Sequence, residues 1–178
     1  MSSHFSTGEQ ISTGEHISTG ELSTESLILR RWTPDDVSAV LAGRRLAHWA
    51  EDFPAAGDRA IAGLFADHPQ WYGEYGHRLI IERETGLVVG SIGLFWPPGA
   101  DGLEIGYGTI PSRRGRGYAS AATRALTEFA LGAGVHAVYA DVEPSNPGSV
   151  RVLENAGFRR TGAADGLIRF EMTRNTLG

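Results

Sequence analysis

The chain has 178 residues, 41% of them hydrophobic, which suffices for one domain with a buried core but hardly for two. Its formal net charge of −5 argues against nucleic-acid binding, which depends on many contacts between cations and phosphates. The absence of cysteine excludes disulfides, thiolate metal sites and a cysteine nucleophile, and the spacing of the six histidines gives no reason to expect a metal site.

Residues 1–25 contain an imperfect repeat that begins with Ser-Thr-Gly-Glu, at 6–11, 12–17 and 18–23. Such short copies cannot bury a core, so we expect a flexible or loosely docked extension; an arm that packs on a neighbouring subunit is the alternative. No apolar run approaches the ~18 to 20 residues that span a bilayer, and the start lacks the features of a signal peptide. We expect a cytoplasmic protein with no membrane segment and a folded domain at 26–178.

The folded domain is expected to begin with a strand at 26–32, followed directly by a helix. Thr33-Pro34 provides a capping residue and a proline suited to the first helical position. Apolar residues at helical spacing extend this helix from Val37 to about Leu46. The segment 48–77 mixes aromatic and acidic residues, and one helix is expected within it, near 58–66.

A meander of three strands should follow, at 78–83, 87–96 and 103–110, with a short hairpin turn between the first two. The third strand runs into a basic, glycine-rich turn, Arg113-Arg114-Gly115-Arg116-Gly117. Its glycines permit positive φ, so that successive N–H groups can converge on an anion at the start of a helix. The turn therefore predicts a phosphate-binding loop. A tight turn with solvated arginines and a short RNA-binding segment are the alternatives.

The last part of the chain continues the alternation of helices and strands. Apolar residues at 119, 122, 126, 129 and 133 mark one face of the helix after the turn. The remaining elements are a strand at 135–142, a helix from Asn146-Pro147 to Gly157, and strands at 158–161 and 167–172. This order predicts an α/β fold of the α+β kind: a mixed, mostly antiparallel central sheet with helices on both faces.

Two segments resemble the GNAT superfamily of N-acetyltransferases and, within it, the Rim-type branch named for ribosomal-protein N-terminal acetyltransferases. Arg114-Gly115-Arg116-Gly117-Tyr118-Ala119 fits the family's Q/R-x-x-G-x-G/A pyrophosphate loop, and Glu104-Ile105-Gly106-Tyr107 is typical of the Rim-type strand before it. The segment 146–158, with an asparagine, a serine and a terminal Gly-Phe, fits the second block. The similarity in element order runs from about Leu27 to Met172.

The resemblance implies acetyl-CoA as the acetyl donor, with its pyrophosphate on the basic loop and its pantetheine arm along the edge of the preceding strand. Family members commonly place an asparagine near this arm; here it is Asn146, which is also a good N-cap, and both roles are compatible. The implied cofactor-binding residues are Thr109, Ile110, Arg114, Gly115, Arg116, Gly117, Tyr118, Ala119 and Asn146.

Acetyl transfer to an amine requires a base for the amine and a proton for the departing thiolate. The resemblance implies Glu104 as the base, directly or through water; a partner for a nearby arginine is the alternative. Many family members supply a tyrosine as the acid at the position of Leu153, so that role is vacant here. The Rim-type pattern instead implies Ser149 near the thiol sulfur, with helix capping as its alternative role.

The acceptor pocket is expected to draw on the segment between the first helix and the second strand, and on a strand end. Aromatic side chains beside carboxylates suit a cationic amine, and they equally suit core packing with an acidic rim. The candidate substrate-binding residues are Trp49, Glu51, Phe53, Trp71, Tyr75 and Phe95. No motif names the acceptor: a protein N-terminus, a free amino acid, an antibiotic or another small amine all fit.

The expected function is N-acetyl transfer from acetyl-CoA to a primary amine by direct attack in a ternary complex. A sensor of GNAT fold that binds acetyl-CoA without transferring the group is one alternative. A nicotinamide dinucleotide module is another, because Gly115-x-Gly117 partly matches its fingerprint, although Ser120 stands at the third glycine position. A homodimer is compatible with the family.

Overall fold

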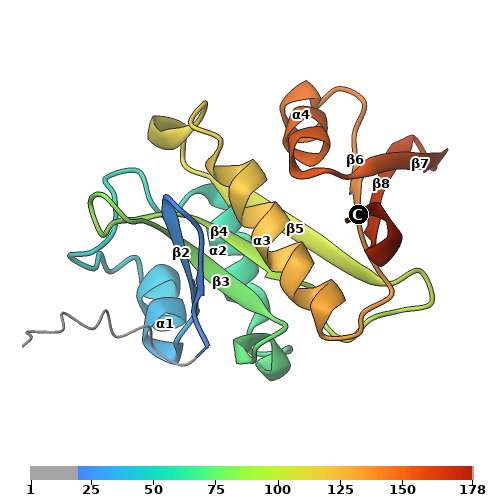
Figure 1. Ribbon diagram of the computed structural model, residues 1–178. Helices are drawn as coiled ribbons and strands as arrows, with labels where there is room; N and C mark the ends of the chain where they lie inside the picture. Colours follow the sequence, from blue (N-terminus) through green and yellow to red (C-terminus); the bar gives the residue numbers. More distant parts are fainter. Residues whose placement is uncertain (1–19, 178) are drawn as a thin grey trace, which may run out of the picture.

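The structure, a computed structural model, describes residues 20–177 and has a central β-sheet with helices on both faces (Figure 1). In these residues the sheet has eight strands in the order β1-β2-β3-β4-β5-β6-β8-β7. The strands are β1 (Leu22–Ser23), β2 (Leu27–Arg31), β3 (His77–Glu82), β4 (Val88–Leu94), β5 (Leu103–Thr109), β6 (Ala137–Val142), β7 (Arg159–Ala164) and β8 (Leu167–Thr173). Only β5 and β6 pair in parallel, which confirms the expected mixed, mostly antiparallel sheet.

The helices cover opposite faces of this sheet. They are α1 (Pro34–Ala42), α2 (Ala56–Leu64), α3 (Tyr118–Gly132) and α4 (Pro147–Ala156), with short 3-10 turns η1 (Pro69–Tyr72), η2 (Pro111–Arg113) and η3 (Arg174–Thr176). In Figure 1, α3 crosses the front of the sheet, where it contacts β2, β4, β5 and β6, and α2 lies behind the sheet, where it contacts α1.

The first helix begins as its sequence predicts. The Thr33 hydroxyl accepts a hydrogen bond from the Asp36 N–H at 3.2 Å, and the Asp36 carboxylate accepts one from the Thr33 N–H at 2.8 Å. The helix ends at Ala42, earlier than the expected Leu46, because Gly43 adopts φ 68° and terminates it in the left-handed region.

The paired backbone begins before the expected domain boundary at residue 26. Leu22 and Ser23 pair with Leu29 and Ile28 of β2, so the sheet includes the end of the repeat-bearing segment. The remainder of that segment, residues 1–19, lies outside the described residues. Within residues 20–177 no helix is long and apolar enough to cross a membrane, and no group of His, Asp and Glu side chains could hold a metal ion.

The parallel pairing of β5 and β6 is short. Leu103 pairs with Val138 and Glu104 with Tyr139, and no register continues beyond them. Gly102 permits the close approach, because a Cβ there would lie 2.4 Å from the carbonyl oxygen of Ala137. From residue 105 to residue 109 the edge of β5 that faces β6 has no strand partner, and the sheet opens toward the loop before α3.

Candidate active site

The loop before α3 presents free N–H groups to open space. Gly115 and Gly117 both have φ 77°, and a Cβ at either residue would meet no atom within 4 Å. In the part of the chain that the structure describes, the N–H groups of 115–117 have no hydrogen-bond acceptor. The first turn of α3, a 15-residue helix, adds further unpaired N–H groups. The loop can therefore bind an anion at the positive end of a helix.

Two of the loop arginines form ion pairs with a buried carboxylate. Arg113 Nε lies 3.2 Å and Arg116 Nη1 lies 3.4 Å from the carboxylate of Glu82, a β3 residue that is 1% exposed. Burial opposes its charge, but hydrogen bonds from Tyr118 and Thr85 and the charge of Arg113 outweigh burial and hold the pKa of Glu82 below its ordinary value. Sequence reasoning missed Glu82, because a lone carboxylate in a strand does not show its partners.

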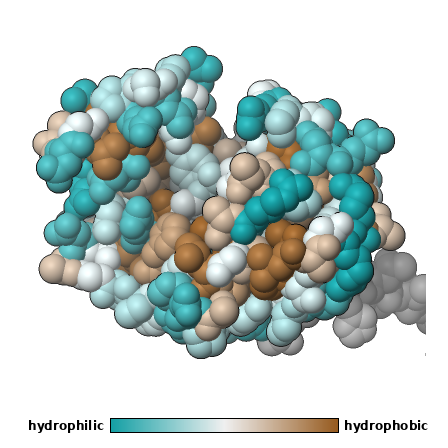
Figure 2. Space-filling view, turned by 180° about the vertical axis from the view of Figure 1, so that it is seen from behind, coloured by the Kyte–Doolittle hydropathy of each residue, from teal (hydrophilic) through white to brown (hydrophobic). Residues whose placement is uncertain are grey.

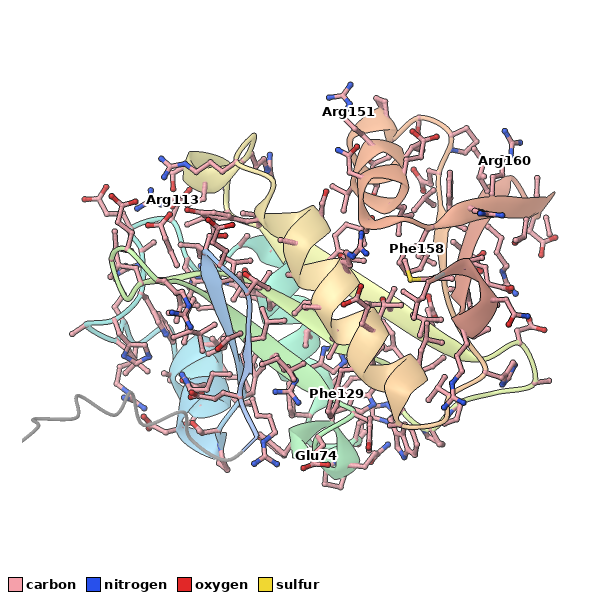
Figure 3. The ribbon with its side chains drawn as sticks, viewed as in Figure 1. Glu74, Arg113, Phe129, Arg151, Phe158 and Arg160 are labelled. Atoms are coloured by element: carbon pink, nitrogen blue, oxygen red, sulfur yellow. The ribbon has the colours of Figure 1, made fainter. Side chains whose placement is uncertain are left out.

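A groove of about 680 Å³ lies between the loop and α4, and Figure 2 shows the molecule hollowed between the end that carries α4 and the rest. Expected cofactor-binding residues that line it are Thr109, Arg114, Gly115, Gly117, Tyr118, Ala119 and Asn146. Ile110 is fully buried, and Arg116 is not in the lining. Arg113 on η2 and Arg151 on α4 add positive charge from the two sides of the opening (Figure 3).

Hydroxyl groups from β5 and α4 meet in this groove. The Tyr107 phenol lies 2.9 Å from the Ser149 hydroxyl and 3.2 Å from the Ser149 carbonyl oxygen. Burial raises the pKa of Tyr107, and the hydrogen bond to Ser149 offsets part of that effect. Asn146 Oδ1 caps α4 by accepting the Ser149 N–H at 3.1 Å, while Leu153 is fully buried. The sequence motif contained Tyr107 but gave no sign of its contact with Ser149.

A second cavity, of about 340 Å³, lies between α2 and the strands β3, β4 and β5. It shares residues Tyr107 to Thr109 and Arg114 with the groove, so the two spaces meet along β5. Asp58, His77 and Ser91 are its other polar lining side chains. Asp58 lay inside the helix expected near 58–66, and Ser91 inside an apolar strand, so neither stood out in the sequence.

Of the candidate substrate-binding residues, Phe95 lines this second cavity, and the structure places the others elsewhere. Trp49, Phe53 and Trp71 are buried in the core, Tyr75 stacks on Phe129, and Glu51 is exposed. Trp49 and Phe53 pack edge to face with ring centroids 5.1 Å apart. The three tryptophan and phenylalanine side chains named here as buried therefore pack in the core, which was the alternative to a role in amine binding.

Glu104 is exposed on β5 and lines neither space. Strand alternation places it on the same face of β5 as Gly106 and Gly108, which line the second cavity. Partial burial and the negative charge of Asp141 raise the pKa of Glu104, and the charge of Arg169 offsets part of this. Arg169 forms ion pairs with Asp141 and Asp101, both at 2.7 Å, and within residues 20–177 it forms none with Glu104.

A comparison with protein-family models identifies the family of this chain. The model of the acetyltransferase (GNAT) domain matches residues 26–159, from β2 through α4. The chain belongs to the GNAT acetyltransferase family. A relative from Bacillus subtilis (strain 168), the uncharacterized N-acetyltransferase YnaD, is 32% identical over 84 residues, 47% of this chain. The match spans 49% of YnaD, about half of its length.

Solved structures of similar fold cover most of this GNAT protein. An acetyltransferase from Agrobacterium tumefaciens str. C58 is 24% identical with a TM-score of 0.67, over 94% of this chain and 100% of that chain. Mycobacterium smegmatis RimJ in complex with CoA-disulfide is 22% identical with a TM-score of 0.57, over 85% of this chain and 83% of that chain. These likenesses show the fold of the GNAT protein and do not separate the Rim-type branch from others.

Proposed function

We propose that this GNAT protein is an acetyl-CoA-dependent N-acetyltransferase, of the Rim-type branch, that acts on a primary amine by direct attack in a ternary complex. The observation that carries the proposal is the meeting of the groove and the second cavity along residues 107–109 of β5. Direct transfer requires donor and acceptor to lie side by side, and contiguous spaces allow that without a covalent enzyme intermediate.

The groove has the chemistry that acetyl-CoA needs. The free N–H groups of residues 115–117 and the start of α3 suit the pyrophosphate, and Arg114 and Arg151 supply charge for the phosphates. The open edge of β5 offers backbone groups to the amides of the pantetheine arm, near Thr109. Acetyl-CoA, when bound, supplies the thioester whose acetyl group is transferred.

One residue of β5 and one of α4 then divide the proton transfers. Glu104 receives, through a water, the proton that the amine loses as its nitrogen bonds to the thioester carbonyl carbon, and its raised pKa suits this task. Ser149 donates a proton to the sulfur as the carbon–sulfur bond breaks and regains one from the hydrogen-bonded Tyr107 phenol, which solvent re-protonates while Glu104 releases its own proton to solvent. The products are an amide and CoA with a free thiol.

Calorimetric titration with acetyl-CoA and with NAD tests the donor site, and release of free thiol in the presence of an amine panel tests the transfer. We expect acetyl-CoA to bind, NAD not to bind, and at least one amine to release thiol. Binding of NAD without acetyl-CoA would overturn the proposal. Binding of acetyl-CoA with no thiol release across peptides, small amines and aminoglycosides would instead identify a sensor.

A further inference from the structure

The cavity beside the groove is lined by α2 and by three strands, and its lining carries little charge. Among the residues that line it, Asp58 alone has a carboxylate. Arg114, at the border with the groove, is the one permanent cation of this lining. Any ligand that enters the cavity from the groove therefore meets a single negative charge.

The Asp58 carboxylate is 4% exposed and is held from the protein side. Its Oδ2 accepts the Ala55 N–H at 2.7 Å, and its Oδ1 accepts a short hydrogen bond from the Ser91 hydroxyl. Within residues 20–177 no cationic side chain forms an ion pair with it. Burial raises the pKa of Asp58, and these hydrogen bonds, with a smaller contribution from the charge of Arg59, offset only part of the effect. A buried carboxylate that forms no ion pair is unfavourable, and a cationic ligand in contact with it would relieve that cost.

His77, also in the lining, adds an aromatic surface without charge. Its side chain is 1% exposed, and its Nε2 has no hydrogen-bond partner among the described residues. The ring packs against Trp71 and Phe95, with centroids 4.6 and 5.1 Å away. Burial, with a smaller contribution from the charge of His68, lowers the pKa of His77 to about 4, so the ring is neutral near pH 7. It does not repel a cation, and ring faces attract one.

We infer that this cavity takes the acceptor as a small primary amine with one ammonium group on an apolar body. The ammonium donates hydrogen bonds to the Asp58 carboxylate and the Ser91 hydroxyl oxygen, and the apolar body packs against Phe95 and Ile61. Asp58 binds and orients the amine. The ammonium releases one proton to solvent before its nitrogen can attack, and Glu104, on the face of β5 that carries Gly106 and Gly108, takes the second proton through water. This inference rests on the proposed function and names its substrate class.

Size and charge together disfavour larger polycations. A cavity of about 340 Å³ is near the lower end of ligand sites, which span about 300 to 1,000 Å³. A polyamine or an aminoglycoside brings several ammonium groups, and each would need its own carboxylate or water once buried. Asp58 is the one carboxylate of the lining, so it can pair with one of these ammonium groups.

The test is calorimetric binding to the CoA-saturated wild-type protein, in which no acetyl group is available for turnover. The probes are 2-phenylethylamine, its uncharged counterpart 2-phenylethanol, spermidine and kanamycin. We expect the amine to bind at least about tenfold more tightly than the alcohol, because the alcohol cannot form the charge-assisted hydrogen bonds that the ammonium donates to Asp58. We also expect it to bind more tightly than either polycation. Equal binding of amine and alcohol, or preference for a polycation, would overturn the inference.

A variant pair assigns the effect to one side chain. Asp58→Asn keeps an acceptor for the Ala55 N–H, so the cap of α2 is retained while the charge is lost. We expect it to weaken 2-phenylethylamine binding about tenfold or more while CoA affinity stays within about twofold. Asp67→Asn, at an exposed carboxylate just after α2, should change neither. Unchanged amine binding in Asp58→Asn contradicts the inference.

The outcomes separate the inference from the proposed function. Failure of the wild-type protein to bind CoA at all would remove the proposed function and the inference with it. CoA binding without discrimination between the amine and the alcohol would remove only the inference. Should Asp58→Asn fail to fold, the comparison of amine with alcohol on the wild-type protein still decides, because it requires no variant.

Discussion

The phenol of Tyr118, the first residue of α3, donates a 2.7 Å hydrogen bond to the buried carboxylate of Glu82. The same carboxylate holds Arg113 and Arg116, so β3 is tied to the anion-binding loop from behind. A negative charge beneath the loop thus fixes the positions of residues that would otherwise repel one another.

Glu82→Gln should lower the free energy of unfolding by about 2 kcal/mol, because a hydrogen bond to a charged group contributes about 1.5–3 kcal/mol and glutamine retains part of the network. Urea denaturation measures this change. Glu84→Gln, in the exposed turn after β3, is the matched control and should stay within about 0.5 kcal/mol of wild type. Similar losses in both variants would show that Glu82 has no special role.

Gly117→Glu should abolish tight binding of acetyl-CoA, lowering affinity more than about tenfold, because it places a carboxylate in a site built for phosphates. Gly43→Glu is a control with the same kind of backbone strain, since φ is 77° at Gly117 and 68° at Gly43. Both variants should lose stability, by roughly 1–2 kcal/mol. Calorimetry should show that only Gly117→Glu loses affinity for acetyl-CoA. If Gly117→Glu retains that affinity, the loop is not the phosphate-binding site.

Tyr107→Phe and Ser149→Ala should each raise the thiol pKa of CoA bound in the groove, because hydroxyl donors near the sulfur stabilise the thiolate. Ultraviolet absorbance of the thiolate as a function of pH measures this without any acceptor. Turnover with an active amine should fall by about 100-fold, the lower range for general acid catalysis. Tyr75→Phe, whose ring stacks on Phe129, should leave both quantities unchanged. A thiol pKa that is the same in all variants would place these hydroxyls away from the sulfur.

Glu104→Gln should remove the acid limb of the pH–rate profile. The base must be ionised to accept a proton, so the wild-type rate should fall as the pH drops through the pKa of Glu104, which lies above its ordinary value. The glutamine variant should lose about 100-fold in kcat at high pH, with little change in KM for the amine. Asp58→Asn should instead raise KM for the amine, with little change in kcat. An unaltered profile in Glu104→Gln would assign the base elsewhere.

The elements of this fold were predictable because their limits are encoded locally. Thr33 caps α1, and Asn146 caps α4, through contacts with residues three positions away. Alternating apolar runs with turn residues between them identified the strands. The end of α1 was not predicted, because it depends on one left-handed residue, Gly43, whose conformation the apolar spacing did not reveal. The two-residue strand β1 was not predicted either, because it lies in the repeat-bearing segment.

The site was less predictable, because its decisive contacts join distant parts of the chain. Ser91 meets Asp58 across 33 positions, and Tyr107 meets Ser149 across 42. No pattern of neighbouring residues in the sequence predicts either contact. Aromatic composition was also ambiguous: Trp49 and Phe53 fill the core beside the sheet, because a buried wall and a ligand-binding wall use the same side chains.

The short pairing of β5 with β6 affects the stability of the protein before any ligand binds. Past Glu104, the backbone groups of β5 that face β6 are left for water, as at the edge of a sheet. A donor molecule lying there, as proposed, would act as a missing strand between two halves of the sheet. Amide hydrogen exchange at 105–109 would then slow as the acetyl-CoA concentration rises. The stability of the folded protein would thus depend on the concentration of its own substrate.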